Sequence, residues 1–261
     1  MCLGCDFRSN TNKMVSLNVY LLLLAGVQFA MTAPNRDRRR QDTEGCSRSS
    51  PDLNECVGNS IQYFVNFMAS GKITPKVAIT AFDPLLLPNM TISHQTKNFN
   101  AIYVNRYLLG LKNSFIYDTS VDLDKFDFST TFLMPALELL GMYSGESLDD
   151  QEATENSILT ISVRSSTAKF RVKGELFKSA ARVEFLRLNV TDVDLTMGPY
   201  VINDLDHSTH IPRVNRHFNS IPRPEFVKLI EKDLRVQLSS RLQHIANEVL
   251  ALAPYEKFFP V

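Results

Sequence analysis

The sequence predicts an α+β fold in which one long C-terminal helix covers an antiparallel β-sheet. From Glu225 to Leu252, apolar residues recur at steps of four and three, which is the spacing of one helix face. Between Phe115 and Met197, several consecutive runs show a period of two, as half-buried strands do. One face of such a meander must be covered, and the helix is the natural cover.

Prolines mark both ends of the C-terminal helix. Pro224 precedes it, Pro254 follows it, and neither proline nor glycine lies between Glu225 and Leu252. A coiled-coil strand is the alternative, but the apolar steps do not keep a strict seven-residue period. Because further apolar residues flank the main face, we expect a buried central helix that is surrounded by other elements. The main apolar face consists of Phe226, Ile230, Leu234, Leu238, Leu242, Ile245, Val249 and Leu252.

The elements that come before this helix in the chain are predicted from capping residues, prolines and the alternation of apolar residues. Ser50-Pro51-Asp52 supplies an N-cap and a first-turn proline for a helix that Gly71 can end. Residues 72–87 are expected to be extended because their prolines disfavour helix. The acidic stretch 144–156 is predicted to be an exposed or flexible loop. Strands are predicted at 115–123, 126–132, 158–163, 169–177 and 181–197, with Phe115, Tyr117, Val121 and Leu123 on one face of the first.

The N-terminus has the layout of a secretory signal peptide, predicted to span residues 1–33. Lys13 precedes an apolar run from about Val19 to Val27, and small residues follow up to Ala33. The run is shorter than the roughly 20 residues that cross a bilayer. Residues 34–45, with the cluster Arg36–Arg40, are predicted to be a basic flexible arm, and proteolytic processing there is the alternative. Residues 46–261 are predicted to form one domain.

Cysteine content and charge agree with a secreted chain. Cys2 and Cys5 leave with the signal peptide, so Cys46 and Cys56 are expected to form one disulfide. Asn89 and Asn189 each begin an Asn-x-Thr acceptor pattern for N-glycosylation. The whole chain has 28 basic and 28 acidic residues, a balance that gives no reason to expect nucleic-acid binding.

The sequence lacks the common motifs for catalysis and cofactor binding. The sequence contains no Gly-x-Ser-x-Gly elbow, phosphate-binding loop, dinucleotide fingerprint or His-Glu-x-x-His motif. The best metal candidates lie in a polar stretch without clear periodicity, where exposed histidines are the default interpretation. We therefore expect no catalytic residues, no metal and no cofactor. Those candidates are Asp204, Asp206, His207, His210 and His217.

Four segments together resemble the insect takeout and juvenile-hormone-binding proteins. Cys46-Ser-Arg-Ser-Ser-Pro-Asp-Leu-Asn-Glu-Cys56 resembles the opening of that family, and Phe82-Asp83-Pro84-Leu85 looks like its Asp-Pro-Leu signature. The stretch from Pro135 to Gly141-Met-Tyr143 is similar to its strand ending in Gly-x-Tyr, and Pro254-Tyr255-Glu-Lys-Phe258-Phe259-Pro260 is similar to its C-terminal ending. The segments occur in order over residues 46–260.

The resemblance implies the tubular lipid-binding architecture, in which a strongly curved antiparallel sheet wraps a long helix around an apolar tunnel. It implies a secreted, monomeric carrier of juvenile hormone or another isoprenoid, fatty acid or lipid, without stable membrane insertion. Tyr103, Tyr117 and Tyr143 are candidates for a hydroxyl that binds a ligand head group. Ordinary core packing is the alternative for each expected lining residue. Those residues are Phe115, Tyr117, Phe128, Phe132, Phe226, Ile230, Leu234 and Leu238.

The sequence is compatible with two other functions. One is a secreted signalling or interaction protein with the same fold and a collapsed cavity, which would contain no lipid after purification. The other is an esterase-like hydrolase, for which no constellation of Ser, His and acid can be assembled from the sequence. Turnover of a fluorogenic ester that is lost on Ser144→Ala would support it.

Overall fold

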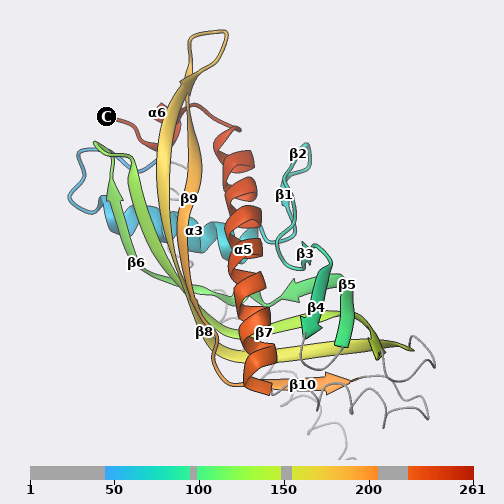
Figure 1. Ribbon diagram of the computed structural model, residues 1–261. Helices are drawn as coiled ribbons and strands as arrows, with labels where there is room; N and C mark the ends of the chain where they lie inside the picture. Colours follow the sequence, from blue (N-terminus) through green and yellow to red (C-terminus); the bar gives the residue numbers. More distant parts are fainter. Residues whose placement is uncertain (1–44, 95–98, 148–154, 205–222) are drawn as a thin grey trace, which may run out of the picture. The chain divides into compact units, whose positions relative to one another are not determined.

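Antiparallel strands form an eight-stranded sheet, and two helices, α3 (Leu53–Phe67) and α5 (Arg223–Leu250), lie against it (Figure 1). Side chains of both helices form hydrogen bonds with the backbone of edge strands. The structure is a computed structural model that describes residues 45–94, 99–147, 155–204 and 223–261. Within it, Gly45–Val261 forms one structural unit. The predicted signal peptide and nearly all of the predicted arm lie outside the described residues.

Two long strands form the centre of the sheet. β7 (Asp127–Ser147) and β8 (Glu155–Lys178) pair over most of their lengths. The free edge of β7 is shared by β5 (Phe99–Leu109) and β6 (Phe115–Asp122). The free edge of β8 is shared in the same way by two strands further along the chain, β9 (Glu184–Thr196) and β10 (Tyr200–Asp204).

Short elements complete the unit. Two strands extend the sheet beyond β5, and two others form a separate hairpin. One short helical turn connects β5 to β6, and another lies near the C-terminus. These elements are β3 (Leu85–Leu87) and β4 (Met90–His94) on β5, the hairpin β1 (Lys72–Thr74) and β2 (Val77–Ala78), the 3₁₀ turn η2 (Leu111–Asn113) and α6 (Tyr255–Phe258).

Irregular positions inside the strands bend the sheet. Asn105 in β5, Asp118 in β6 and Ser165 in β8 have positive φ values of 50°, 53° and 54°. Register shifts occur at the first two of these positions. A bulge bends its strand, increases the local twist and changes which side chains face inward. The result is a curled antiparallel sheet, which confirms the α+β class and the curvature that the resemblance implied.

The predicted facing of β6 is wrong because of one such bulge. Ile116 packs against the core, whereas Phe115 and Tyr117 are 58% and 49% exposed. The irregularity between Tyr117 and Ser120 then changes the parity, so that Leu123 contacts buried residues again. A strict period of two across 115–123 therefore could not describe this strand.

The outer edge of β6 is protected by polar side chains of α3. The Gln62 side chain accepts a hydrogen bond from the Ile116 amide at 2.7 Å and donates to the Ser114 carbonyl at 2.9 Å. Asn54 accepts from the Val121 amide at 2.9 Å. Unpaired strand edges invite pairing with other chains, and these side chains occupy the groups that a further strand would use.

The outer edge of β9 is protected by α5 in the same manner. Asn247 accepts from the Leu188 amide at 2.7 Å and donates to the Leu188 carbonyl at 2.9 Å. Gln243 accepts from the Val190 amide at 2.7 Å. On the opposite flank of the helix, Glu248 accepts from the amide and the hydroxyl of Thr80. The helix therefore bridges β9 and the segment that follows β2 (Figure 1).

This position corrects the prediction of a helix surrounded on all sides. α5 buries one face in the core, but Lys228, Lys232 and Val236 lie on an exposed face, and Val236 is 58% exposed. The flanking apolar residues of the sequence therefore do not all enter the core. The predicted length is confirmed, since the helix ends within two residues of both predicted bounds.

Three further sequence expectations differ from the structure. β5 was not predicted as a strand. The predicted runs 158–163 and 169–177 belong to one continuous strand, β8. Both ends of the predicted loop 144–156 are strand instead, because β7 extends to Ser147 and β8 begins at Glu155. Residues 148–154 lie outside the described part of the chain. Polar residues can continue a strand wherever a neighbouring strand pairs with it.

Candidate ligand-binding site

The layer between α5 and the sheet is apolar over most of its extent. From the helix, Phe226, Ile230, Leu234, Leu238 and Ile245 are at most 3% exposed and belong to one hydrophobic cluster. Burial of each such side chain is worth about 1.5–3 kcal/mol. We call this the large cluster. From the sheet it includes Leu85, Ile92, Leu108, Leu137, Leu139, Leu159, Ile161, Val163, Phe170, Val193 and Leu195.

Five of the eight predicted lining residues belong to this layer or pack on it. Phe226, Ile230, Leu234 and Leu238 are buried members of the large cluster, and Phe132 is a half-buried neighbour of it. Phe132 meets Phe170 edge to face, with the ring centroids 5.2 Å apart. The structure thus brings these five residues together, and their contact with a ligand stays a prediction.

The other three predicted residues lie elsewhere. Phe115 and Tyr117 are exposed on β6, so they are outside the layer between helix and sheet. Phe128 packs with Phe259 of the C-terminal segment, with the ring centroids 6.4 Å apart. It belongs to a second, smaller cluster built around the chain end.

A charged side chain enters the layer between α5 and the sheet. Arg106 follows the β5 bulge at Asn105, which reverses the facing of the strand, so that Tyr103, Arg106 and Leu108 are all buried. Asn tolerates the left-handed backbone that this bulge requires. Arg106 is fully buried, which is rare for an arginine unless it is paired.

The partners of Arg106 come from α5 and from the turn after β3. Its Nη2 forms an ion pair with Asp233 of α5, and its Nη1 donates to the Pro88 carbonyl at 3.0 Å. The guanidinium carbon lies 5.4 Å from the centre of the Tyr103 ring. Asp233 lies between the buried Ile230 and Leu234 in sequence, so the pair crosses the apolar layer from sheet to helix.

Tyr103 lies next to Arg106, and its hydroxyl contacts backbone carbonyls of two strands, β7 and β8. Its hydroxyl reaches the Leu159 carbonyl at 3.0 Å and the Leu139 carbonyl at 3.2 Å. Burial raises the pKa of the Tyr103 hydroxyl, and the charge of Arg106 opposes that shift. Of the three candidate head-group tyrosines, Tyr103 is thus already bonded to the backbone, Tyr117 is exposed, and the Tyr143 side chain lies outside the described part of the structure.

Gly141 explains one of the quoted motifs. A Cβ atom at this position would lie 2.6 Å from Cε2 of Tyr103 and 2.9 Å from the Val104 carbonyl oxygen. The glycine therefore leaves the space in which the Tyr103 ring crosses β7. The Gly-x-Tyr ending of this strand has a packing role in the site.

The Asp-Pro-Leu segment supports the turn that follows β5. The Asp83 carboxylate accepts hydrogen bonds from the amides of Gly110 and Lys112, the latter at 2.9 Å. Leu85, two residues later, is 1% exposed in the large cluster. The motif thus joins the β3 strand to the end of β5, close in sequence to Arg106.

The opposite end of the domain is closed by the C-terminal segment. Cys46 donates its amide to the Phe258 carbonyl at 2.7 Å, and Arg48 donates its amide to the Pro260 carbonyl at 2.9 Å. The Arg48 guanidinium also lies 4.6 Å from the centre of the Tyr255 ring. We call the surrounding apolar group the tail cluster; it contains Cys46, Leu186, Tyr255 and Phe259, with Leu53, Cys56, Val57, Leu123, Phe126, Phe128, Leu176, Leu188, Leu250 and Phe258 packed on it.

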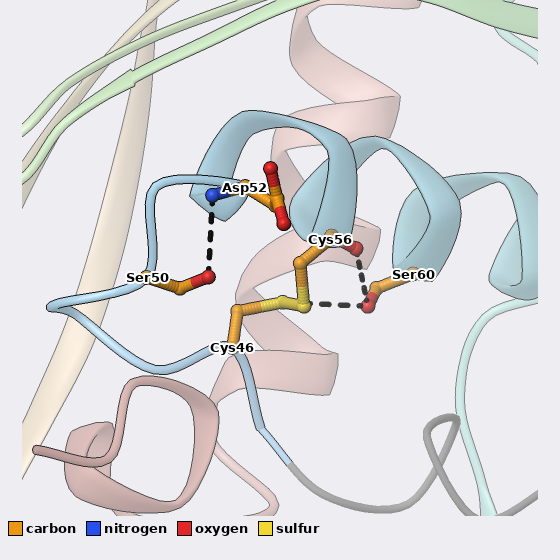
Figure 2. Close-up of a disulfide and its surroundings, with 5 residues drawn as sticks. All are labelled: Cys46, Ser50, Asp52, Cys56 and Ser60. Carbon is orange, nitrogen blue, oxygen red and sulfur yellow. Dashed lines mark hydrogen bonds between the residues drawn. A yellow bond between two sulfur atoms is a disulfide. The ribbon is translucent and has the colours of Figure 1, made fainter.

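The predicted disulfide is confirmed, and it links the segment around Cys46 to Cys56 of α3. Cys46 and Cys56 are bonded, with their Cα atoms 5.8 Å apart (Figure 2). The Ser60 hydroxyl donates to the Cys56 carbonyl at 2.9 Å, and the Ser50 hydroxyl accepts from the Asp52 amide at 3.2 Å. α3 begins at Leu53, slightly later than the capping signal predicted.

Among the described residues, no group of three or more His, Cys, Asp or Glu side chains could hold a metal ion. Asp204 ends β10, and the other four metal candidates lie outside the described residues. In that same part of the chain, no helix is both long enough and apolar enough to cross a membrane.

Comparison with known families agrees with the curled sheet and its long helix. The model of the haemolymph juvenile hormone binding protein family matches residues 21–260. The chain belongs to this family. The match includes every motif quoted from the sequence, from the Cys46 segment to the C-terminal Pro260.

One solved structure supports the fold of this family member. The crystal structure of Epiphyas postvittana Takeout 1 matches with a TM-score of 0.56 and 14% sequence identity, covering 84% of this chain and 100% of that chain. A structure of lipopolysaccharide binding protein matches with a TM-score of 0.37 and 10% identity, over 73% of this chain and 38% of that one. A comparison with the sequences of characterised proteins finds no match.

Sequence reasoning missed the buried Arg106–Asp233 pair. A charged residue inside a strand normally indicates a solvent-facing position, and only the bulge at Asn105 turns Arg106 inward. Asp233 also occupies a polar position beside the apolar helix face. A polar residue beside an apolar helix face does not indicate a partner in the sheet.

Proposed function

We propose that this chain is a secreted carrier of a small hydrophobic ligand, held between α5 and the curled sheet. The single observation that carries the proposal is the apolar layer of the large cluster, in a chain that belongs to a juvenile-hormone-binding family. Removing apolar ligand surface from water is worth about 25 cal/mol per Å². Such a layer therefore needs few polar contacts to bind an isoprenoid, a fatty acid or a similar lipid.

The residues proposed to contact the ligand are those that the structure brings to this layer. They are Phe132 from the sheet with Phe226, Ile230, Leu234 and Leu238 from α5. The tail cluster is excluded from the proposal because its aromatic rings pack on one another and on the disulfide. Juvenile hormone itself is one candidate ligand within this class.

The proposal includes secretion as a glycosylated monomer. Secretion is supported by the signal-peptide pattern, the Cys46–Cys56 disulfide and the family. Asn89 lies exposed after β3, and Asn189 lies exposed on β9, so both acceptor sites are accessible. Mass spectrometry of protein secreted by insect cells, before and after glycosidase treatment, tests the N-terminus and both acceptor sites.

Ligand binding is tested on the same secreted protein. Native mass spectrometry and organic extraction should find a co-purified lipid, and the neutral dye N-phenyl-1-naphthylamine should bind with increased fluorescence. Leu234→Phe adds volume inside the layer and should weaken dye binding at least fivefold. The matched control Val236→Phe, on the exposed face of the same helix, should leave it unchanged.

The contrary result would favour a different function. A folded, secreted chain that contains no lipid and binds no dye would contradict the carrier proposal. It would instead support a signalling or interaction protein with a collapsed cavity.

A further inference from the structure

We propose that Arg106 forms the polar subsite of the carrier and that its Nε–H binds a neutral carbonyl oxygen of an otherwise apolar ligand. This inference rests on the proposed carrier function. The proposed partners of this buried donor are neutral esters and other uncharged carbonyl compounds.

The first step is the hydrogen bonding of the guanidinium. Nη2 is paired with Asp233 and Nη1 with the Pro88 carbonyl. Nε is buried and has no hydrogen-bond partner among the residues that the structure describes. A buried donor left unsatisfied is costly, especially on a charged group. Arginine can only donate, so the missing partner must be an acceptor.

The second step is the location of the group. Arg106 is fully buried and reaches from β5 to Asp233 on α5. Two of the proposed contact residues, Ile230 and Leu234, flank Asp233 in the helix sequence and are at most 3% exposed. The unsatisfied donor therefore lies in the same layer that is proposed to hold the ligand.

The third step is charge. Asp233 already neutralises the guanidinium, and its side chain is only 17% exposed. A ligand carboxylate would add an unbalanced negative charge to a site of low dielectric, which is unfavourable. A neutral carbonyl oxygen would satisfy Nε–H without adding charge. The subsite should therefore prefer an ester to a carboxylate of the same chain length.

The alternative explanation is that the ion pair only stabilises the fold. A buried pair is weak evidence for stability, because apolar residues of similar volume often replace it without loss. The nearby Tyr103 hydroxyl is satisfied by backbone carbonyls and does not compete for the same acceptor. The experiment must therefore separate ligand preference from stability.

The test uses the full secreted chain and three probes, namely methyl dodecanoate, dodecanoate and tetradecane, each displacing N-phenyl-1-naphthylamine at pH 7.5. A hydrogen bond from a charged donor should make the ester bind about tenfold or more tightly than the hydrocarbon. It should also bind more tightly than the carboxylate. The double variant Arg106→Met/Asp233→Leu removes both charges and the Nε–H donor, so the ratio of ester to hydrocarbon affinity should fall to about one.

Two further variants sharpen the result. Asp233→Asn leaves the guanidinium uncompensated and should shift the preference from the ester towards the carboxylate. Arg171→Met/Asp192→Leu removes a half-exposed ion pair between β8 and β9 and should change no preference. An ester preference that survives Arg106→Met/Asp233→Leu, or that is absent in wild type, overturns the subsite.

A measurement on the wild-type chain does not depend on folding of the variants. In ¹⁵N-edited NMR spectra, the buried Arg106 Nε–H resonance should shift on addition of methyl dodecanoate and not on addition of tetradecane. Equal shifts with both probes overturn the subsite and leave the carrier function intact. A wild-type chain that binds neither dye nor hydrocarbon contradicts the carrier function, and the subsite with it.

Discussion

The large cluster and the tail cluster differ in what lies at their centres. The large cluster surrounds an ion pair between Arg106 and Asp233 and a buried donor, the Arg106 Nε–H, which has no hydrogen-bond partner among the described residues. The tail cluster is built from aromatic rings, aliphatic side chains and a disulfide, and the backbone of its two segments is directly hydrogen-bonded. The chain end is thus held by a disulfide and backbone hydrogen bonds. The large cluster instead surrounds a buried Arg106 Nε–H that no described residue accepts.

This difference separates stability from ligand binding. The tail cluster has the features of a structural closure, since a disulfide, backbone hydrogen bonds and aromatic contacts join its segments. The large cluster has the features of a binding layer, because its apolar surface is continuous and its polar group is incompletely bonded. Changes in the two clusters should therefore affect different measurements.

The largest effect is expected from removing one partner of the buried pair. Arg106→Met alone leaves Asp233 without its counter-charge and should lower the free energy of unfolding by about 3–5 kcal/mol, or somewhat less because Asp233 is partly exposed. Arg106→Met/Asp233→Leu should recover most of that loss. Urea unfolding followed by far-ultraviolet circular dichroism measures both. Equal losses in the single and double variants would show that packing by Arg106, and not its charge, matters for stability.

Alanine substitutions at Gly141 and Gly174 test how each cluster tolerates one added methyl group. Gly141→Ala places Cβ against the Tyr103 ring, which two carbonyls hold in place, and against the Val104 carbonyl oxygen. It should cost about 2–3 kcal/mol of stability. Gly174→Ala meets only side-chain atoms, the nearest being Cδ1 of Leu186 at 2.9 Å, and should cost less. Urea midpoints decide, and a larger loss at Gly174 would contradict the fixed position of Tyr103.

The disulfide tests the structural role of the tail cluster. Cys46→Ala/Cys56→Ala should lower stability by about 2–3 kcal/mol, since it releases a short cross-linked loop. Amide hydrogen exchange should increase at positions 46 and 48, whose backbone amides donate to carbonyls of the C-terminal segment. Dye affinity should stay within about twofold of wild type once the chain is folded. A large loss of dye binding in the folded variant would show that the two clusters are coupled.

The smallest effect is expected at the protected sheet edge. Asn247→Ala removes both hydrogen bonds to Leu188 and should cost about 1–2 kcal/mol. Ser240→Ala, on the exposed face of the same helix, is the matched control and should change stability by less than about 0.5 kcal/mol. Thermal unfolding by calorimetry measures the difference. If the two variants are equally stable, water replaces the amide of Asn247 without cost.

The sequence predicted most of the elements but not their irregularities. The long helix, the disulfide and most strands follow from local patterns, namely apolar spacing, bounding prolines and cysteine number. The facing of Phe115 and Tyr117 was predicted wrongly, because the bulge at Asp118 has no distinct sequence signal. The burial of Arg106 was missed because β5 was not predicted as a strand and the bulge at Asn105 has no distinct sequence signal.

The candidate site shows the same division. The helix residues from Phe226 to Leu238 were predicted to lie together because one helix face repeats every few residues, and they do. The sheet residues depend on register and bulges, which involve residues far apart in the chain, and only Phe132 of the four predicted lies at the layer. Local periodicity therefore located the helix side of the site better than the sheet side.

By itself the sequence determined the α+β class, the length of the C-terminal helix, the disulfide and the family motifs, because each depends on residues close together in the chain. Only the tertiary structure decided that α5 closes the sheet from one side and that Arg106 meets Asp233 within the apolar layer. Both follow from the curvature of the sheet, which is accompanied by bulges at Asn105 and Asp118 and by a positive φ at Ser165. A bulge reverses the facing of every residue that follows it in its strand, so its consequences become visible only when the strands are paired.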